Sequence, residues 1–135
     1  MDNIIVVMEK NIETGILEKE YCLIEANEYG ELLDGIYVIN KNGALYVHLK
    51  ITTGRDVSDW EYSAIFDYYD PDALSGGGLE IQEILDEYNP SWEIIFPCPD
   101  EALAFQKSVV SILEKHFIEL QDTYKIISDK KADYE

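Results

Sequence analysis

The sequence predicts an α+β fold: an antiparallel sheet of five or six strands with one long C-terminal helix packed across one face. Two observations carry this prediction. Apolar residues recur at steps of three and four near the C-terminus, and two hairpin signals occur before residue 52. A chain of 135 residues is large enough for one core without disulfides, so we expect a single domain, residues 1–135. Within it, residues 1–98 should be mainly sheet, residues 100–131 the helix and residues 128–135 a frayed polar tail.

The first two strands are expected at residues 3–10 and 16–26, joined by a loop with Gly15 in the left-handed conformation. This loop sets a register in which opposite charges face each other, each such pair stabilising the hairpin by roughly 0.2–1 kcal/mol. The expected pairs are Lys10 with Glu18, Glu9 with Lys19, Val7 with Tyr21 and Val6 with Cys22. Because both faces are apolar around Val7, we expect the hairpin inside the sheet rather than at its edge.

After a polar connection at residues 27–34, a second hairpin is predicted at residues 35–41 and 44–51. Its turn, Asn42-Gly43, is the strongest short hairpin signal in a sequence. The two-residue turn pairs Val38 with Val47 and Ile36 with Leu49 on a core face, and Ile39 with Tyr46 and Tyr37 with His48 on the other. The second face is mixed aromatic and polar, so we expect it to be half-exposed.

Residues 57–70 fit two patterns. Ser58 and Glu61 resemble a helix capping box, and a helical stripe follows them. The same segment also alternates strictly, with aromatic residues opposite polar ones, and its aromatic content favours a pleated strand. The strand is the interpretation we prefer.

Proline and glycine then interrupt the pattern, and the Ser75-Gly76-Gly77-Gly78 run is expected to be a flexible loop. Residues 79–88 fit either a short helix or a strand. Residues 91–96 predict a strand with Trp92, Ile94 and Phe96 on one face.

The long helix is predicted from one apolar stripe, with Asp100 placed to accept bonds from the unpaired N–H groups at its start. The stripe consists of Ala102, Phe105, Val109, Ile112, Leu113, His116, Leu120, Tyr124 and Ile127. A histidine on such a stripe is typical of a packed core residue bonded to a carbonyl, so we expect His116 to be structural. The helix can bury its stripe only against the sheet.

The net charge of the chain limits the classes of partner that it is expected to bind. The formal net charge is −18, and residues 51–100 hold twelve acids and a single base, Arg55, a net of −11. Such a field repels phosphate backbones and anionic lipid surfaces, so neither direct nucleic-acid binding nor membrane binding is expected. It favours a basic protein or a divalent cation. Ten of the sixteen aromatic residues are tyrosine, a residue enriched where proteins dock.

The compartment is inferred from cysteine and hydropathy. Cys22 and Cys98 lie 76 positions apart without a CxxC spacing, which fits reduced thiols in an intracellular protein. The longest aliphatic run, residues 4–8, is far short of a membrane span, and no signal-peptide pattern occurs. We therefore expect a cytoplasmic protein, and its small size and composition suggest a bacterial one.

The leading functional hypothesis is a non-enzymatic binding protein, of the inhibitor, immunity-protein or antagonist type, that covers a basic partner with an acidic, tyrosine-rich face. A structural subunit or a homodimer without a ligand is a further alternative. The candidate partner-binding residues lie on the half-exposed hairpin face and in the 57–70 segment. They are Tyr37, Tyr46, His48, Trp60, Glu61, Tyr62, Asp67, Tyr68 and Tyr69.

An alternative function is a divalent-cation module, for which Ca²⁺ is the best candidate because hard cations take several closely spaced carboxylates. The candidate ligands are Asp67, Asp70, Asp72 and Glu80. Their spacing is not that of an EF-hand. No nucleophile elbow, phosphate-binding loop or His-Glu-x-x-His helix occurs, and nothing in the sequence supplies an orienting carboxylate for His48. We therefore expect no enzymatic activity.

Overall fold

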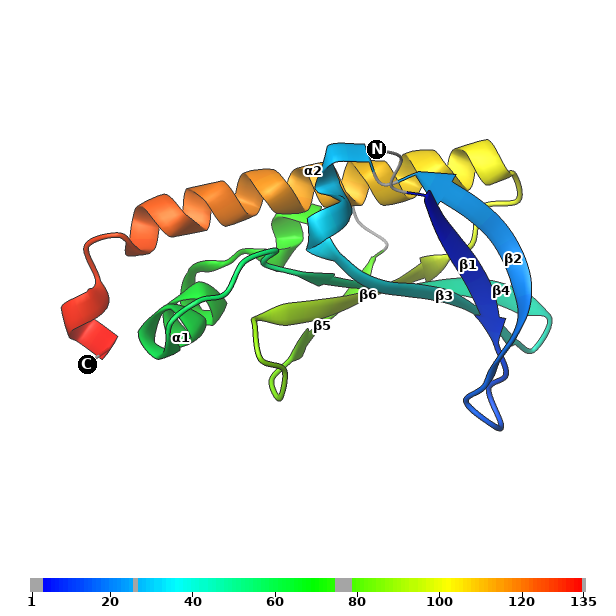
Figure 1. The fold of residues 1–135 in the computed structure, drawn as a ribbon, viewed down its shortest axis with the longest axis horizontal. Helices are drawn as coiled ribbons and strands as arrows, with labels where there is room; N and C mark the ends of the chain where they lie inside the picture. Colours follow the sequence, from blue (N-terminus) through cyan, green and yellow to red (C-terminus); the bar gives the residue numbers. More distant parts are fainter. Residues whose placement is uncertain (1–3, 26, 75–78, 135) are drawn as a thin grey trace.

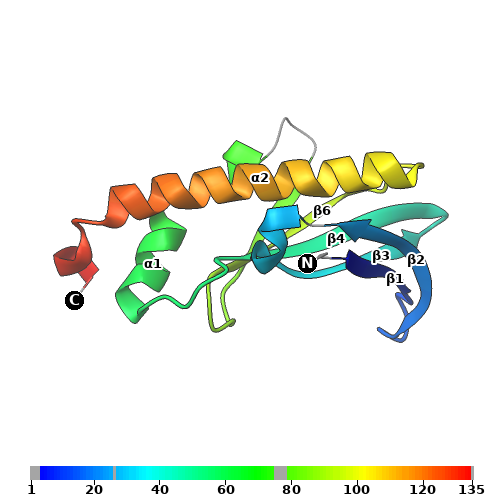
Figure 2. The ribbon, with the colours of Figure 1, turned by 45° about the horizontal axis from the view of Figure 1, so that its top comes forward.

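The computed structural model describes residues 4–25, 27–74 and 79–134, and in this part of the chain it confirms the α+β fold. A six-stranded sheet has the order β2-β1-β3-β4-β6-β5, and the long helix α2 (Ala102–Ile127) lies along one face of it (Figures 1 and 2). The strands are β1 (Ile4–Lys10), β2 (Leu17–Glu25), β3 (Leu33–Lys41), β4 (Ala44–Thr52), β5 (Glu80–Ile84) and β6 (Ser91–Pro97). A second helix, α1 (Asp59–Tyr68), and three 3-10 helices, η1 (Asn27–Leu32), η2 (Pro71–Leu74) and η3 (Lys131–Tyr134), complete the described elements.

The β1–β2 hairpin differs from its prediction in register and in position. Glu9 pairs with Lys19 as expected, and their side chains form an ion pair at 3.7 Å. Two bulges then leave Tyr21 and Glu18 without a direct partner, so Val7 pairs with Cys22, Val6 with Leu23 and Lys10 with Leu17. Bulges of this kind are frequent at sheet edges, and β2 is an edge strand. Of the two strands of this hairpin, only β1 lies inside the sheet. It pairs with β3 in parallel, and this is the one parallel pairing among the described strands.

The β3–β4 hairpin confirms its predicted register. Tyr37 pairs with His48, Val38 with Val47, Ile36 with Leu49 and Ile39 with Tyr46. Asn42 and Gly43 both have positive φ, 57° and 88°, which is the geometry of a type I′ turn. The local turn signal was therefore sufficient to align both strands.

The strand predicted within residues 57–70 is wrong, because Asp59–Tyr68 forms the helix α1. The backbone N–H of Ser58 donates to Glu61 Oε1 at 2.9 Å, the reciprocal contact of a capping box. The helix buries Ala64 and Ile65 completely. The start signal and the burial of this stripe outweigh the strand propensity of the aromatic residues, since β propensity depends on having a sheet to pair with.

In the following segment, the strand alternative holds for Glu80–Ile84, and β6 is confirmed with Trp92, Ile94 and Phe96 facing the core. The expected glycine loop, residues 75–78, lies outside the described residues.

Helix α2 is shorter than predicted and begins after Glu101 instead of Asp100. Most of the expected stripe is buried, with Tyr124 half-buried and Ala102 exposed. The buried residues of the helix are Phe105, Val109, Ile112, Leu113, His116, Leu120, Thr123 and Ile127. In place of a frayed tail, the chain forms η3 beside α1, where Tyr134 Oη donates to Asp67 Oδ2 at 2.6 Å. Across the described ranges, no helix has the length and apolar content needed to cross a membrane.

Candidate functional site

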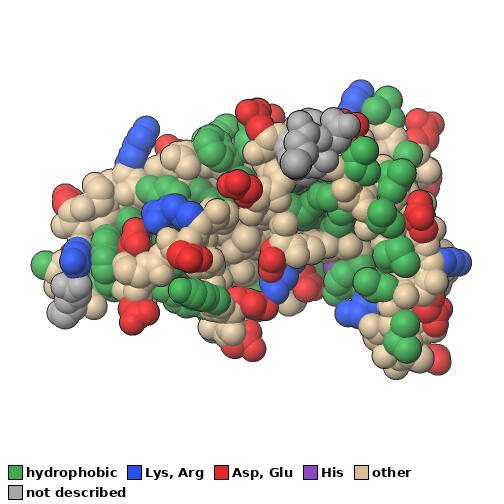
Figure 3. All heavy atoms as spheres, in the orientation of Figure 1, with side chains coloured by type: hydrophobic (Ala, Val, Ile, Leu, Met, Phe, Trp, Pro, Cys, Tyr) green, Lys and Arg blue, Asp and Glu red, His purple; other side chains and the backbone are tan. Residues whose placement is uncertain are grey.

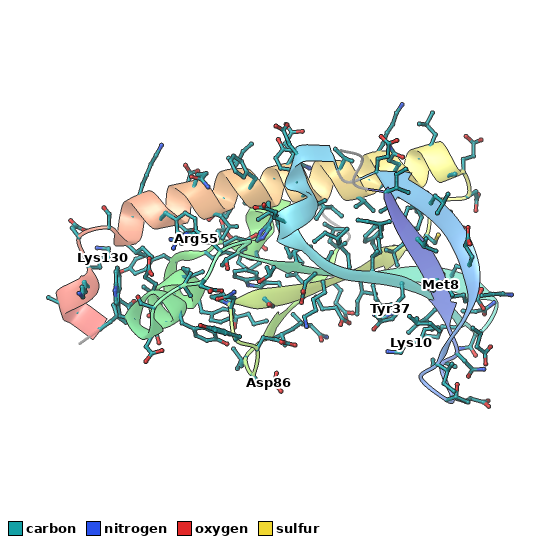
Figure 4. All side chains as sticks on the ribbon, viewed as in Figure 1. Met8, Lys10, Tyr37, Arg55, Asp86 and Lys130 are labelled. Carbon is teal, nitrogen blue, oxygen red and sulfur yellow. The ribbon has the colours of Figure 1, made fainter. Side chains whose placement is uncertain are left out.

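One face of the sheet is packed against α2, and no described helix covers the other (Figure 2). We call this second surface the open face. Strand alternation and pairing place Tyr37, His48 and Ile95 on it, side by side across β3, β4 and β6. Tyr46 and Glu80 share the face because they pair with Ile39 and Ile95, respectively. In Figure 4, Tyr37 and Lys10 project from the sheet on the side away from α2.

The open face carries a chain of contacts centred on His48. Its imidazole stacks on the Tyr37 ring, with centroids 5.1 Å apart and planes 8° from parallel. From the neighbouring strand β1, Lys10 Nζ lies 4.4 Å from the centroid of the Tyr37 ring. His48 Nδ1 is 3.0 Å from Glu93 Oε1. Burial, and then the Glu93 charge, raise the pKa of Tyr37.

Glu93 is the residue of this candidate site that sequence reasoning missed. We expected no carboxylate to orient His48, and the sheet supplies one from β6, 45 residues away in the chain. A neutral imidazole that donates its Nδ1–H to a carboxylate keeps Nε2 as an acceptor. Alternation within β6 places Glu93 on the face opposite Trp92. Only the pairing of β4 with β6, which no local signal encodes, could have identified the partnership.

A groove of about 540 Å³ adjoins His48 on the open face. Its walls combine aliphatic and aromatic side chains with a carboxylate, an imidazole and an ammonium group. The lining residues are Ile39, Lys41, Asn42, Ala44, Tyr46, His48, Glu80 and Ile95.

A second exposed surface lies where α1 meets the turn between β5 and β6, with Asp86 at its tip (Figure 4). We define the acidic rim as Asp59, Tyr62, Leu85, Asp86 and Tyr88. Tyr62 Oη donates to the Leu85 carbonyl at 2.9 Å, which joins the helix to the turn. Leu85 is 69% exposed and Tyr88 73% exposed. Burial raises the pKa of Tyr62, and the charges of Asp86 and Glu87 add to this effect.

The predicted partner-binding residues divide into two groups. Tyr37, Tyr46 and His48 share the open face as expected. Those from the 57–70 segment lie on or after α1, so they do not extend a sheet face. Glu61 is committed to the capping box and to Arg55 at 3.3 Å, and Trp60 packs against the core.

Tyr69 is a clear correction, because it is 5% exposed and cannot contact a partner. Its hydroxyl lies 2.7 Å from His116 Nδ1, and His116 Nε2 lies 2.7 Å from the Thr52 carbonyl oxygen. A carbonyl only accepts, so Nε2 carries the proton and Tyr69 donates to Nδ1. Burial lowers the pKa of His116 to about 4. This confirms His116 as a core residue that links α2, β4 and the end of α1.

Two of the four predicted cation ligands, Asp67 and Asp70, accept hydrogen bonds from other residues. Asp67 accepts the bond from Tyr134, and Asp70 Oδ1 accepts from the Asp72 backbone N–H at 3.0 Å. Glu80 faces the groove on the open face. Over the ranges that the structure describes, no group of three or more His, Cys, Asp or Glu side chains is arranged to hold a metal ion.

A family of unknown function, DUF6762, matches the chain over residues 1–135. The chain belongs to this family. No curated protein and no solved structure matches it. For a DUF6762 member, evidence about function therefore comes from the open face and the acidic rim themselves.

Proposed function

We propose that this DUF6762 member is a non-enzymatic binding protein of the bacterial cytoplasm that covers a basic protein surface with its acidic rim and open face. The compartment is part of the proposal and rests on the thiols, since Cys22 and Cys98 are both free. Inhibitors, immunity proteins and antagonists of basic enzymes act through surfaces of this physical kind.

The observation that carries the proposal is the imbalance of charge around exposed apolar groups. The sequence has no Lys or Arg between Arg55 and Lys107. Arg55 pairs with Glu61, and Lys50 pairs with Asp34 and Glu87. Asp59 and Asp86 form no ion pair with any described residue. Acidic side chains outnumber basic ones on the face shown in Figure 3.

Exposed tyrosine beside unpaired carboxylates suits a surface rich in lysine and arginine. The aromatic ring contributes apolar area and cation–π attraction, while the carboxylates steer a basic partner toward the rim. The bond from Tyr62 Oη to the Leu85 carbonyl holds the backbone of the turn against α1, which lowers the backbone entropy that docking would cost.

The test compares capture by two charge-matched variants. The rim variant carries Asp59→Lys, Asp86→Lys and Tyr88→Ala. The control carries Glu114→Lys, Asp122→Lys and Ile118→Ala, which are exposed positions on α2. Each variant changes the net charge equally and removes one exposed apolar side chain.

We expect the immobilised wild-type protein to retain a basic protein from a lysate of the source cells at about 0.05 M salt and to release it near 0.5 M, where the Debye length is only a few ångström. The control should retain the same protein and the rim variant should lose it. Equal retention by the wild type, the rim variant and the control would refute the proposal.

A further inference from the structure

We propose that the groove on the open face is a pocket for an arginine side chain of the basic partner, and that His48 makes the affinity of this pocket depend on pH. The inference rests on the proposed function, because the arginine belongs to the basic protein named there. It adds the side chain that is recognised and the condition under which it is released.

The groove walls match the two parts of an arginine. Ile39, Ile95 and the Tyr46 ring offer apolar surface to its aliphatic stem. The Tyr46 ring also suits a guanidinium stacked on its face. Glu80, exposed at the wall, provides a carboxylate that can accept the two parallel N–H groups of the guanidinium.

The balance of charge at the groove favours a cation over an anion. Among the described lining residues, Lys41 is the one lysine or arginine, and it is exposed beside the hairpin turn. The Glu80 carboxylate in the lining offsets the charge of Lys41, and the Glu93 carboxylate contacts His48 Nδ1. Lys10 and Lys50 also lie on the open face, but Lys50 is paired with Asp34 and Glu87. Four carboxylates therefore stand against three ammonium groups around the groove, and the chain as a whole carries a net charge of −18.

His48 supplies the pH dependence through its tautomer. While the imidazole is neutral, its Nδ1–H donates a hydrogen bond to Glu93, and Nε2 remains an acceptor for a guanidinium N–H. Protonation puts an N–H and a positive charge at that position, and the pair with Glu93 becomes an ion pair. The acceptor is then lost and the arginine is repelled.

The charged and titratable groups around His48 come from every neighbouring strand: Lys10 on β1, Tyr37 and Lys41 on β3, Tyr46 and Lys50 on β4, Glu80 on β5 and Glu93 on β6. Among these residue types, histidine is the one that ordinarily changes charge between pH 5 and 8. The His48→Gln variant decides whether a binding change over this interval belongs to His48.

The probe is the peptide acetyl-Gly-Arg-Gly-amide, with the citrulline peptide as its uncharged counterpart, added to the full chain while methyl signals are followed by NMR. We expect saturable shifts of Ile39 and Ile95 with the arginine peptide at about pH 8. The citrulline peptide should bind about tenfold more weakly, because its neutral urea group lacks the positive charge that strengthens the bonds to Glu80. The arginine peptide at about pH 5.5 should be weakened about equally, because a protonated His48 no longer accepts a guanidinium N–H.

Three variants separate the roles. Glu80→Gln should weaken arginine binding about tenfold, while Glu83→Gln, an exposed carboxylate on the opposite face of the same strand, should leave it unchanged. His48→Gln should bind the peptide equally at both pH values, since an amide does not titrate.

The pocket is refuted if the Ile39 and Ile95 signals do not move at about pH 8, or if both peptides move them equally. Shifts confined to the methyl groups of Leu85, on the acidic rim, would also refute it, yet they would leave the docking function standing. Failure of the rim variant to lose its captured protein refutes the function itself, so the two failures are distinguishable.

Discussion

Acid should destabilise this protein through one buried side chain, His116. Its imidazole is fully buried, its Nε2–H donates to the Thr52 carbonyl, and its Nδ1 accepts from Tyr69. The folded protein keeps it neutral down to a pKa of about 4, against an ordinary value of 6.5. Between these values the unfolded chain binds a proton that the folded protein does not. The stability contributed by neutral His116 is therefore complete above pH 6.5 and is lost as the pH falls toward 4.

The two pKa values give the magnitude. Their difference of about 2.5, at about 1.36 kcal/mol for each pKa unit, corresponds to about 3 kcal/mol. This is a large part of the 5–15 kcal/mol that is typical of a folded domain. Relief of repulsion among the carboxylates acts in the opposite direction as they protonate, so the His116 contribution must be measured as a difference between two proteins.

The assay is urea unfolding at a series of pH values for the wild type, His116→Gln and His48→Gln. The stability advantage of the wild type over His116→Gln should shrink by about 3 kcal/mol from about pH 7 to pH 4. His48→Gln keeps His116, so its free energy of unfolding should retain the pH dependence that His116 gives to the wild type. If His116→Gln proves too unstable, the NMR titration of the wild-type His116 ring supplies the same answer. Parallel pH profiles, or a ring that titrates near 6.5, would refute the reasoning.

Four other measurements test the architecture. Tyr69→Phe leaves His116 Nδ1 buried without a donor and should lower the free energy of unfolding by about 1–3 kcal/mol in urea. Ser58→Ala removes the hydroxyl of the α1 capping box and should cost about 0.5–2 kcal/mol, whereas Ser63→Ala, at an exposed position in the same helix, should cost little. Gly54→Ala should cost about 1–3 kcal/mol, because φ is +73° and the new Cβ would lie 3.0 Å from Leu32 Cδ2. Finally, Tm in a thermal melt should rise by several degrees as inert salt screens the net charge of −18; an unchanged or falling Tm would contradict this expectation.

Parts of the fold could be predicted because their signals are local. Asn42-Gly43 aligned both strands of its hairpin, and the spacing of residues such as Phe105, Val109 and Leu120 identified the buried side of α2. The α1 segment shows where local signals conflict. Its alternating aromatic residues favoured a strand, but no nearby segment of the sequence signals a strand with which it could pair. The Ser58 cap and the burial of Ala64 and Ile65 made it a helix.

The candidate site could be predicted only in part, for the same reason. Tyr37, Tyr46 and His48 were placed together because one hairpin holds all three. Glu93 and Glu80 join them only when β4 pairs with β6 and β6 with β5, contacts between segments far apart in the chain. Tyr69 was misplaced because its burial depends on the side chain of His116, 47 residues later.

By itself, then, the sequence determined that two hairpins form, the register of the second, the apolar side of the long helix and the excess of negative charge, since these depend on turn chemistry, periodicity and composition. The tertiary structure alone decided which strands are neighbours, that β1 and β3 run in parallel, and which carboxylate orients His48. The physical reason is that long-range pairing is selected by how all the apolar faces are buried together, a property of the whole chain that no single segment carries.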